Sequence, residues 1–364
     1  MILMNDFKAD PEDLIREECA AAERVLRSGW FILGSEVKRF EEEWAAFCGV
    51  RNAAGTGNGM DALEIGLRAS GIGPGDEVIT TPMTAFATVL AILRAGATPV
   101  LADIDPATAL MDRKSVLRCV TSKTRALLPV HLYGQVRDMD KWQALCRDKG
   151  LELLEDCAQS HGAKWGGRSC GTFGSWGAFS FYPTKNLGAI GDGGALITDN
   201  PELAEKARVL RNYGQSTRYS HPVLGLNSRL DEMQAALLSV RLKRLPAFLA
   251  RRREIASMYR AGISNPAITL MDPPVKAESH VHHLFVIRCR ERDRLMDHLK
   301  IRNVESLIHY PVPIHFQEPC KTIRRDPQGL SAAETHAGEC LSIPCHPYMT
   351  NQDAAQVVEA LNAF

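Results

Sequence analysis

The chain contains 364 residues, which at ~150 residues per domain is enough for about two domains and a large buried core. Its 43 basic and 43 acidic side chains cancel, and 45% of its residues are hydrophobic. This composition excludes a disordered, collagen-like or coiled-coil chain, and it disfavours a nucleic-acid-binding or anionic-membrane surface.

Residues 50–200 alternate between short apolar runs and longer stretches with helical periodicity. Alternation of this kind is typical of β-α-β crossovers, so we expect an α/β body with a mostly parallel sheet. The expected strands are 78–81, 99–104, 126–130, 152–155, 178–181 and 195–198, and the expected helices are 61–69, 88–95, 113–120 and 138–149.

The apolar runs of strand length stop after residue 200. Apolar residues at three-to-four spacing predict a long helix over 229–261, which we expect Pro246 to interrupt. We therefore divide the chain into a large domain, residues 1–245, and a small C-terminal α+β domain, residues 246–364. Within the small domain we expect strands at 284–288 and 306–309 and helices at 293–302 and 351–361.

Three segments carry residues suited to chemistry. A glycine-rich turn over 55–61 leads into a helix, whose first N–H groups can hold a phosphate. Asp156 follows an apolar strand, at the end where open α/β sheets bind ligands. Lys185 lies among a strand, a proline and glycines, where a desolvated amine can attack a carbonyl. Taken singly, these segments also fit a tight turn, a helix N-cap and a surface lysine.

Taken together, the three segments supply what pyridoxal phosphate (PLP) requires. The turn would anchor the phosphate, Asp156 would meet the ring nitrogen, and Lys185 would bond to the aldehyde. Longer motifs extend this match over nearly the whole chain: GWFILG at 29–34, HLYGQ at 131–135, EDCAQSHGA at 155–163, SFYPTKNLGAIGDGG at 180–194, GLNSRLD at 225–231 and HYPVP at 309–313.

On these motifs the chain resembles the DegT/DnrJ/EryC1/StrS family of sugar-nucleotide aminotransferases, which are PLP enzymes of fold type I. The resemblance implies a mostly parallel seven-stranded sheet between helices and a smaller C-terminal domain. Lys185 matches the lysine that forms the Schiff base and moves a proton, and Asp156 matches the partner of the ring nitrogen. The other implied cofactor contacts are Gly59, Met60, Phe86, Gln159, Ser180 and Asn227, and the implied substrate contacts are His161, Arg229, His309 and Tyr310.

Some of these roles have alternatives. Relatives place an aromatic stacking residue after Pro-x-Thr, whereas this chain has Ala85 followed by Phe86, so either Phe86 covers the ring or Ala85 leaves it partly open. His161 fits a sugar contact and a core histidine equally well. Asn227 and Arg229 match residues that reach the neighbouring subunit's site, so the resemblance implies a homodimer with shared active sites.

We expect amino transfer from L-glutamate to a nucleotide-linked keto-sugar, at C3 of a dTDP-3-keto-6-deoxyhexose. Two alternatives stay open: amination at C4 of a dTDP- or UDP-4-keto-6-deoxyhexose, and a PLP-binding regulatory protein without turnover. The ten cysteines are scattered without a CxxC pair, and the N-terminus lacks a basic segment followed by an apolar one. We therefore expect reduced thiols and a cytoplasmic protein without a membrane span.

Two clusters have unremarkable explanations. The histidines of 280–283 lack acid or cysteine ligands at matching spacing, and alternation in a strand would point them to opposite faces, so no metal is expected. The basic run 251–253 lies beside Glu254 in a helical segment, and we expect it to form a solvated face.

Overall fold

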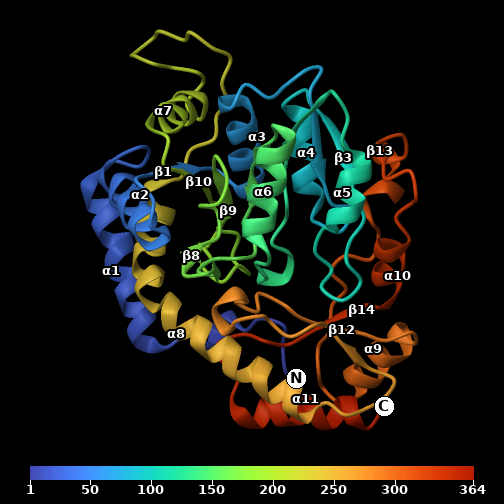
Figure 1. Ribbon diagram of the computed structural model, residues 1–364. Coiled ribbons are helices and arrows are strands. Elements are labelled where there is room, and N and C mark those ends of the chain that lie inside the picture. The colour runs from blue at the N-terminus through green and yellow to red at the C-terminus, as the bar shows by residue number, and fades with distance from the viewer.

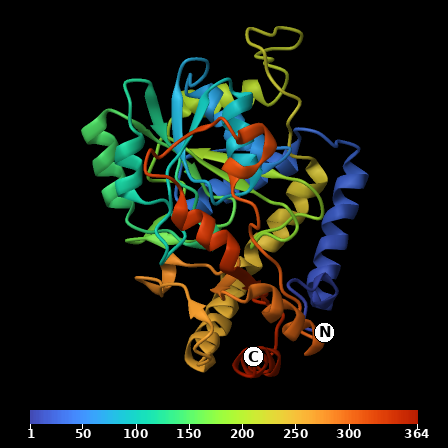
Figure 2. The same ribbon diagram turned by 90° about the vertical axis from the view of Figure 1, so that its right-hand side faces the viewer.

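The computed structural model describes residues 1–364 throughout. Its centre is a twisted sheet with helices on both sides, which confirms the expected α/β class (Figures 1 and 2). The strands of this sheet are β1 (Asn52–Thr56), β2 (Glu77–Thr80), β3 (Thr98–Leu101), β4 (Thr124–Leu127), β5 (Glu152–Leu153), β6 (Glu155–Asp156), β9 (Gly177–Ser180), β10 (Gly194–Thr198) and β13 (Arg324–Arg325).

Most strand pairs in the sheet are parallel. Five strands follow the order β13-β3-β2-β4-β5, all parallel, and four follow the order β1-β10-β9-β6, in which β6 and β9 are parallel. Only Leu154 separates β5 from β6, and its N–H bonds to the carbonyl oxygen of Leu127 at 2.9 Å, so the two groups meet there. The carboxyl ends of β2, β4, β6 and β9 consequently share one edge of the sheet, where open α/β folds bind ligands.

The helices cover the sheet and extend from it. Those of the sheet region are α1 (Glu12–Ser28), α2 (Ser35–Cys48), α3 (Gly59–Ala69), α4 (Phe86–Arg94), α5 (Arg113–Cys119), α6 (Met139–Lys149) and α7 (Pro201–Leu210). The later ones are α8 (Glu232–Gly262), α9 (Arg292–Ile301), α10 (Ser331–Glu339) and α11 (Asn351–Asn362). Short 3-10 turns lie at Phe7–Ala9, Leu132–Gly134, Ala277–Ser279, Ile314–Phe316 and Glu318–Cys320.

Helix α8 runs unbroken through Pro246, so the expected interruption there is wrong. A proline inside a helix costs about 3 kcal/mol because it removes a hydrogen bond and crowds the preceding turn. Packing offsets that cost, since α8 contacts α1 and α2 along its first part and α11 along its last part (Figure 1). Buried Leu245 and Leu249 anchor the helix on either side of the proline.

A second, antiparallel sheet lies in the C-terminal region. Strand β12 (Phe285–Arg288) pairs with β11 (Thr269–Leu270) on one side and with β14 (Cys340–Ile343) on the other. The strand expected at 306–309 is wrong, because only a single bridge joins Leu307 to Ser342. The carbonyl oxygen of His309 instead accepts a hydrogen bond from the hydroxyl of Tyr133, at 2.6 Å.

Segments from the two sides of the boundary expected at residue 245 pair with each other. Ile2 forms a parallel bridge with Val304, and β13 pairs in parallel with β3 at the edge of the large sheet. The N- and C-termini accordingly lie near each other beside the C-terminal region (Figure 1). The division into 1–245 and 246–364 stays a prediction, because each part contributes a segment that pairs with a strand or bridge of the other.

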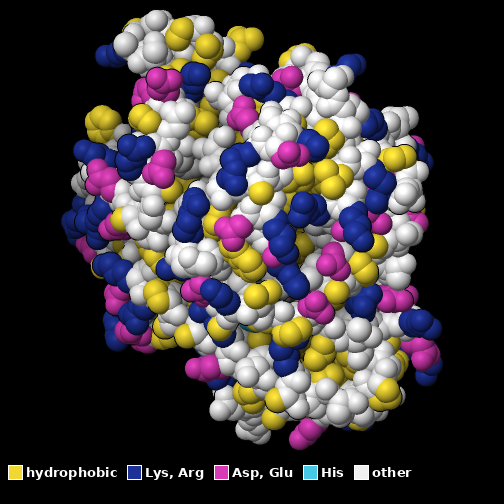
Figure 3. Space-filling view, in the orientation of Figure 1, with side chains coloured by type: hydrophobic (Ala, Val, Ile, Leu, Met, Phe, Trp, Pro, Cys, Tyr) yellow, Lys and Arg dark blue, Asp and Glu magenta, His cyan; other side chains and the backbone are white.

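The surface and the thiols bear on the expected environment. Basic and acidic side chains are intermingled over the face shown in Figure 3 instead of forming separate patches. No helix combines the length and the apolar character needed to cross a membrane. All ten cysteines are free thiols, and nine of them are buried.

Candidate active site

Asp156 ends β6 at the carboxyl edge of the parallel strands, where its side chain is buried. One carboxylate oxygen accepts a hydrogen bond from Oγ1 of Thr88 at 2.8 Å, and the other accepts one from the N–H of Ala158 at 3.1 Å. Burial raises the pKa of Asp156, while these two hydrogen bonds and the charge of Lys185 lower it. The carboxylate is therefore held in a fixed orientation and suited to a cationic N–H partner.

Lys185 lies in the turn that follows β9, where its backbone N–H bonds to the carbonyl oxygen of Tyr182 at 2.8 Å. Its side chain is mostly buried. Burial lowers the pKa of Lys185 to about 8, although the charge of Asp156 opposes this change. A substantial fraction of the amine is therefore neutral near physiological pH, which is the form that attacks a carbonyl carbon.

Gln159 links the large sheet to the C-terminal region. Its Oε1 accepts a hydrogen bond from the N–H of Tyr133 at 2.6 Å, and its Nε2 donates to the hydroxyl of Tyr310 at 3.1 Å. Burial and the charge of Asp156 raise the pKa of Tyr310 to about 12. His309, beside it, has its Nδ1 2.9 Å from Oγ of Ser342, and burial together with the charge of Lys185 lowers its pKa to about 4. The structure thus brings Gln159, His309 and Tyr310 together around Lys185.

The N-terminus of α3 approaches the end of β9 closely. A Cβ on Gly59 would lie 2.5 Å from Cβ and 2.9 Å from Cα of Ser180, so only glycine fits there. The first N–H groups of a helix have no partner within it. The side chain of Asn58 caps the N–H of Asp61 at 2.8 Å, which leaves the N–H groups of Gly59 and Met60 to an anion beside the hydroxyl of Ser180.

Phe86 opens α4 two residues before Thr88, and its ring is partly buried against a core cluster that includes Met83 and Val89. Ala85 caps the same helix and is also partly buried. Both residues therefore lie at the start of α4, the helix that also carries Thr88, the hydrogen-bond donor to Asp156. The choice of a ring-covering residue between them stays a prediction.

His161 lies in the core of the large sheet region. Its side chain is fully buried, and its ring centroid lies 5.8, 5.4 and 5.8 Å from those of Trp44, Phe179 and Phe181. Neither ring nitrogen has a hydrogen-bond partner, and burial, followed by the charge of Lys185, lowers the pKa of His161 to about 3. These contacts favour the core-histidine alternative, while the sugar contact stays a prediction.

Asn227 and Arg229 lie on the surface side of the site. Asn227 is exposed and forms an antiparallel bridge with Asn212. Arg229 donates a hydrogen bond from Nη1 to Oδ1 of Asn212 at 3.0 Å and stacks 5.2 Å from the ring centroid of Tyr213. Within one chain, neither side chain contacts the groups around Lys185, so their implied roles across a dimer stay predictions.

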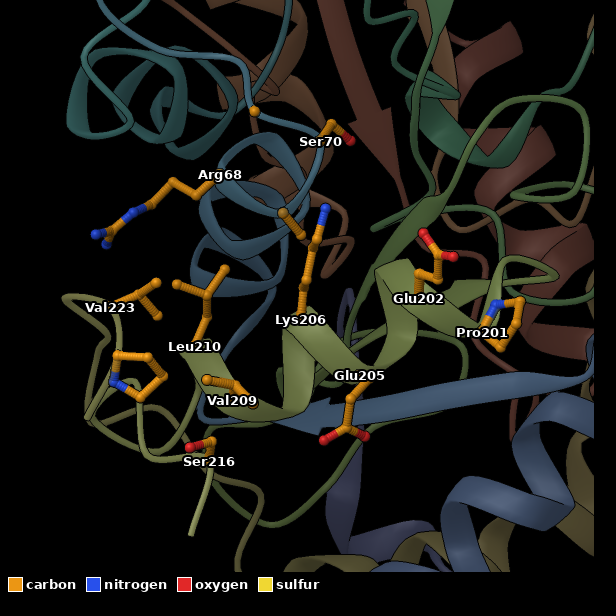
Figure 4. Close-up of a pocket in the computed structure, with 13 residues that line it drawn as sticks. Arg68, Ser70, Pro201, Glu202, Glu205, Lys206, Val209, Leu210, Ser216 and Val223 are labelled. Atoms are coloured by element: carbon orange, nitrogen blue, oxygen red, sulfur yellow. The ribbon is translucent and has the colours of Figure 1, made fainter. Parts of the chain in front are cut away.

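A large surface pocket lies elsewhere, between the end of α3, helix α7 and the segment that follows α7 (Figure 4). It has a volume of about 870 Å³ and includes Arg68 and Lys206 in its lining, but none of the expected site residues. Size alone therefore does not locate the site. The residues with suitable chemistry do.

A second group of buried residues supports the site without joining it. His131, Glu155 and Cys157 are close enough to hold a metal ion. The carboxylate of Glu155, however, already accepts hydrogen bonds from the N–H groups of Gly171, Phe173 and Gly174 at 2.8, 2.6 and 3.0 Å, and contacts Nε2 of His131 at 2.9 Å. The geometry therefore favours a structural role for this carboxylate, fixing the loop that precedes β9.

The histidine run and the basic run both differ from expectation. The rings of His280 and His282 stack at a centroid distance of 3.9 Å, as two side chains on one face of a strand also could. The segment is not a strand, however, and His282 has a positive φ of 44°, so the expectation based on strand alternation does not apply. Arg252 is buried, and its Nη1 donates to the carbonyl oxygens of His282 and Cys345. The basic run is therefore not wholly a solvated face.

Sequence reasoning missed Thr88 and Tyr133, which hold Asp156 and Gln159. The only hint of Thr88 in the sequence was a second threonine, Thr84, four residues earlier. The hydroxyl oxygens of the two threonines lie 2.7 Å apart. Tyr133 lay within a recognised motif, but its positive φ of 60° and its hydroxyl contact with His309 depend on the folded chain.

Comparisons with known proteins agree over the full length of the chain. A family model described as "DegT/DnrJ/EryC1/StrS aminotransferase family" matches residues 12–362. The chain is 47% identical over 363 residues to the "dTDP-3-amino-3,4,6-trideoxy-alpha-D-glucose transaminase" of Streptomyces venezuelae, covering 99% of this chain and 95% of that one. It is 44% identical over 363 residues to the "Pleiotropic regulatory protein" of Geobacillus stearothermophilus, covering 99% and 98%.

Solved structures superpose equally well. The structure of "S. venezuelae DesV in complex with ketimine intermediate" matches with a TM-score of 0.96 and 45% identity, covering 100% of this chain and 98% of that one. The structure of "ntda from bacillus subtilis with bound cofactor pmp" matches with a TM-score of 0.89 and 29% identity, covering 97% and 82%. These superpositions confirm the expected fold.

Proposed function

The chain belongs to the DegT/DnrJ/EryC1/StrS aminotransferase family, and on that premise we propose that it uses PLP to transfer an amino group from L-glutamate to a nucleotide-linked keto-sugar. The proposed acceptor is a dTDP-3-keto-6-deoxyhexose, aminated at C3. The single observation that carries this proposal is that Lys185, Asp156 and the N-terminus of α3 meet at one sheet edge.

The residues present fit PLP on structural grounds. Gly59 forms a cradle that a Cβ would fill, next to two unpaired helix N–H groups, which suits the phosphate. Asp156 offers a buried carboxylate for a ring N–H, and Lys185 offers an amine with a pKa near 8 for the aldehyde. Bound PLP supplies an electron-withdrawing ring that stabilises negative charge at the carbon bearing the amino group.

The chain's own residues have distinct tasks. Asp156, oriented by Thr88, keeps a proton on the ring nitrogen. Lys185, with its amine free, would take the proton from Cα of glutamate on Nζ and deliver a proton to the cofactor carbon that carried the aldehyde. Gln159 and Tyr310 form one hydrogen-bonded pair, which ties the C-terminal region to the end of β6. His309, which burial and the charge of Lys185 keep neutral, is the proposed substrate contact beside this pair.

We propose a homodimer with shared sites, as Asn227 and Arg229 imply. Exposed apolar side chains support this: Trp30 is 64% exposed, Phe31 51%, Tyr219 81% and Leu224 87%. Exposed apolar side chains that lie together mark interaction surfaces, and Trp30 and Phe31 are adjacent in the chain. Tyr219 and Leu224 belong to the loop that projects beyond α7 (Figure 2), a shape suited to reaching a second copy.

The choice of sugar rests on the names of the relatives and on no contact in this chain. The Streptomyces venezuelae relative supports C3 amination, and the cytoplasmic location is supported by ten free thiols. The regulatory name of the Geobacillus stearothermophilus relative keeps a second candidate in view, a PLP-binding protein without turnover.

One series of experiments separates these functions. The PLP-loaded protein should absorb visible light through its lysine-bound cofactor, L-glutamate should remove that band, and 2-oxoglutarate should restore it. A panel of dTDP- and UDP-linked 3-keto and 4-keto sugars should then give an amino sugar fastest with the dTDP-linked 3-keto sugar. A band that no amino acid changes would contradict the aminotransferase proposal and favour the regulatory one.

The shared site has its own test. Lys185→Ala subunits and Asn227→Ala subunits should each be inactive or weakly active alone. Mixing them should restore activity, because one kind of site in the mixed dimer then carries both native residues. A mixture no more active than its parents would contradict the shared site.

A further inference from the structure

A small cavity lies beside Lys185, on the side formed by the amino-terminal segment and the C-terminal region. Its volume is about 40 Å³, and its walls come from residues 5–10, the turn 183–188, helix α8 and residues 346–348. No expected contact of the cofactor or of the substrate other than Lys185 lines it. The cavity is therefore separate in composition from the site described above, although Lys185 belongs to the lining of the cavity and to the site.

Four of its lining residues each leave one buried polar atom without a hydrogen-bond partner: Oδ1 of Asp10, Oδ1 of Asn186, Nε of Arg252 and Nδ1 of His346. The side chains of Asn186, Arg252 and His346 are more than nine-tenths buried. Leaving a buried polar atom unpaired costs on the order of 1–3 kcal/mol, so four such atoms on residues that line one cavity favour an occupant that pairs with them.

The chemistry of these four atoms identifies the occupant as water. The carboxylate and amide oxygens accept hydrogen bonds, the guanidinium nitrogen donates one, and the imidazole nitrogen does either. A single cation would satisfy only the acceptors and a single anion only the donors, whereas water does both. A water molecule needs roughly 10–15 Å³ and typically makes about three hydrogen bonds, so the cavity has room for a few.

We propose that this cavity is a water chamber through which the Lys185 amine exchanges protons with solvent during transamination. The proposal rests on the proposed function only for the timing of the exchange, because the water itself follows from the chain alone. When the Cα–H bond of glutamate breaks, the proton becomes one of three on the Nζ ammonium. Chamber water then takes one of the three and returns another, so the charge is unchanged and the original hydrogen is lost to solvent.

The first test concerns occupancy and does not depend on turnover. A high-resolution crystal structure of the PLP-loaded enzyme should show ordered waters bonded to the four unpaired atoms. His346→Leu removes one of them without removing any observed hydrogen bond, and Asn186→Leu is the second variant should the first not fold. Either variant should lose chamber waters, whereas Ser239→Ala, which removes an unpaired buried hydroxyl on α8 outside the chamber, should keep them.

A dry chamber, or one ion in place of the waters, would overturn the proposal whatever the enzyme catalyses. The second test measures exchange with α-tritiated glutamate in a single turnover. The unaltered enzyme and Ser239→Ala should release most of the tritium to water. The chamber variants should keep several-fold more tritium bound to the enzyme and its cofactor. Equal tritium release from variants that have lost their waters would overturn the exchange role. No turnover of glutamate by any form would instead count against the proposed function.

Discussion

The buried ammonium of Lys185 should make the cofactor-free protein less stable than a variant that lacks it. Burial lowers the pKa of Lys185 from its usual 10.5 to about 8. The folded chain therefore holds this proton less tightly than the unfolded chain, so the ammonium costs stability below pH 8. The pKa difference corresponds to roughly 3 kcal/mol at pH 7, and the cost fades as the pH rises from 8 towards 10.5.

Lys185→Met removes the charge and keeps a long apolar stem. We expect the cofactor-free variant to be inactive and more stable than the parent by about 3 kcal/mol at pH 7, and by less than about 1 kcal/mol at pH 10. Urea unfolding at the two pH values measures both differences. Lys206→Met, at an exposed position on α7, is the matched control and should stay within about 0.5 kcal/mol of the parent. A Lys185→Met effect that is the same at both pH values would refute the reasoning.

Two further predictions concern the groups around the lysine. Thr88→Val removes the hydrogen bond to Asp156, which is worth about 1.5–3 kcal/mol. In steady-state assays kcat/KM should fall roughly tenfold or more, and the acid limb of its pH profile should move to higher pH. Thr88→Ser keeps a hydroxyl and should recover most of the loss. Gly59→Ala would place a Cβ 2.5 Å from Cβ of Ser180 and should weaken PLP binding in an equilibrium titration, whereas Gly57→Ala, whose nearest neighbour lies at 3.3 Å, should bind PLP nearly as tightly as the parent. Equal PLP affinities of the two glycine variants would contradict the cradle.

The central strands were predictable because strands that are buried on both faces contain runs of apolar residues. Every residue of β2 and β10 is buried, and each strand has an apolar centre, Val78 and Ile79 in β2 and residues 195–197 in β10. Strand β1, which consists of small and polar residues, carried no such signal and is defined by its pairing with β10. Strand β13 is a pair of arginines that joins β3 through backbone bonds alone, and side-chain pattern cannot reveal such a strand.

The same division applies to the site. The positions of Asp156 and Lys185 were predictable from their local surroundings, a strand end and a glycine-rich turn, while their roles stay predictions. Thr88 was not, because its contribution depends on a contact with a residue 68 positions away. The sequence left His161 open between a sugar contact and a core histidine, because the aromatic side chains that surround its ring come from distant segments.

The C-terminal region completes this site, and for that reason residues 1–245 should not form it alone. Tyr310 supplies the acceptor for Gln159, and β13 covers the edge of β3. A core cluster mixes residues of both regions, Met83 and Val89 with Leu330 and Ala333 among them, so truncation would expose apolar surface. We expect a chain of residues 1–245 to show no cooperative thermal unfolding and no PLP band, whereas the full chain shows both. A truncated chain that binds PLP with the affinity of the full chain would show that the boundary of the site lies within residues 1–245.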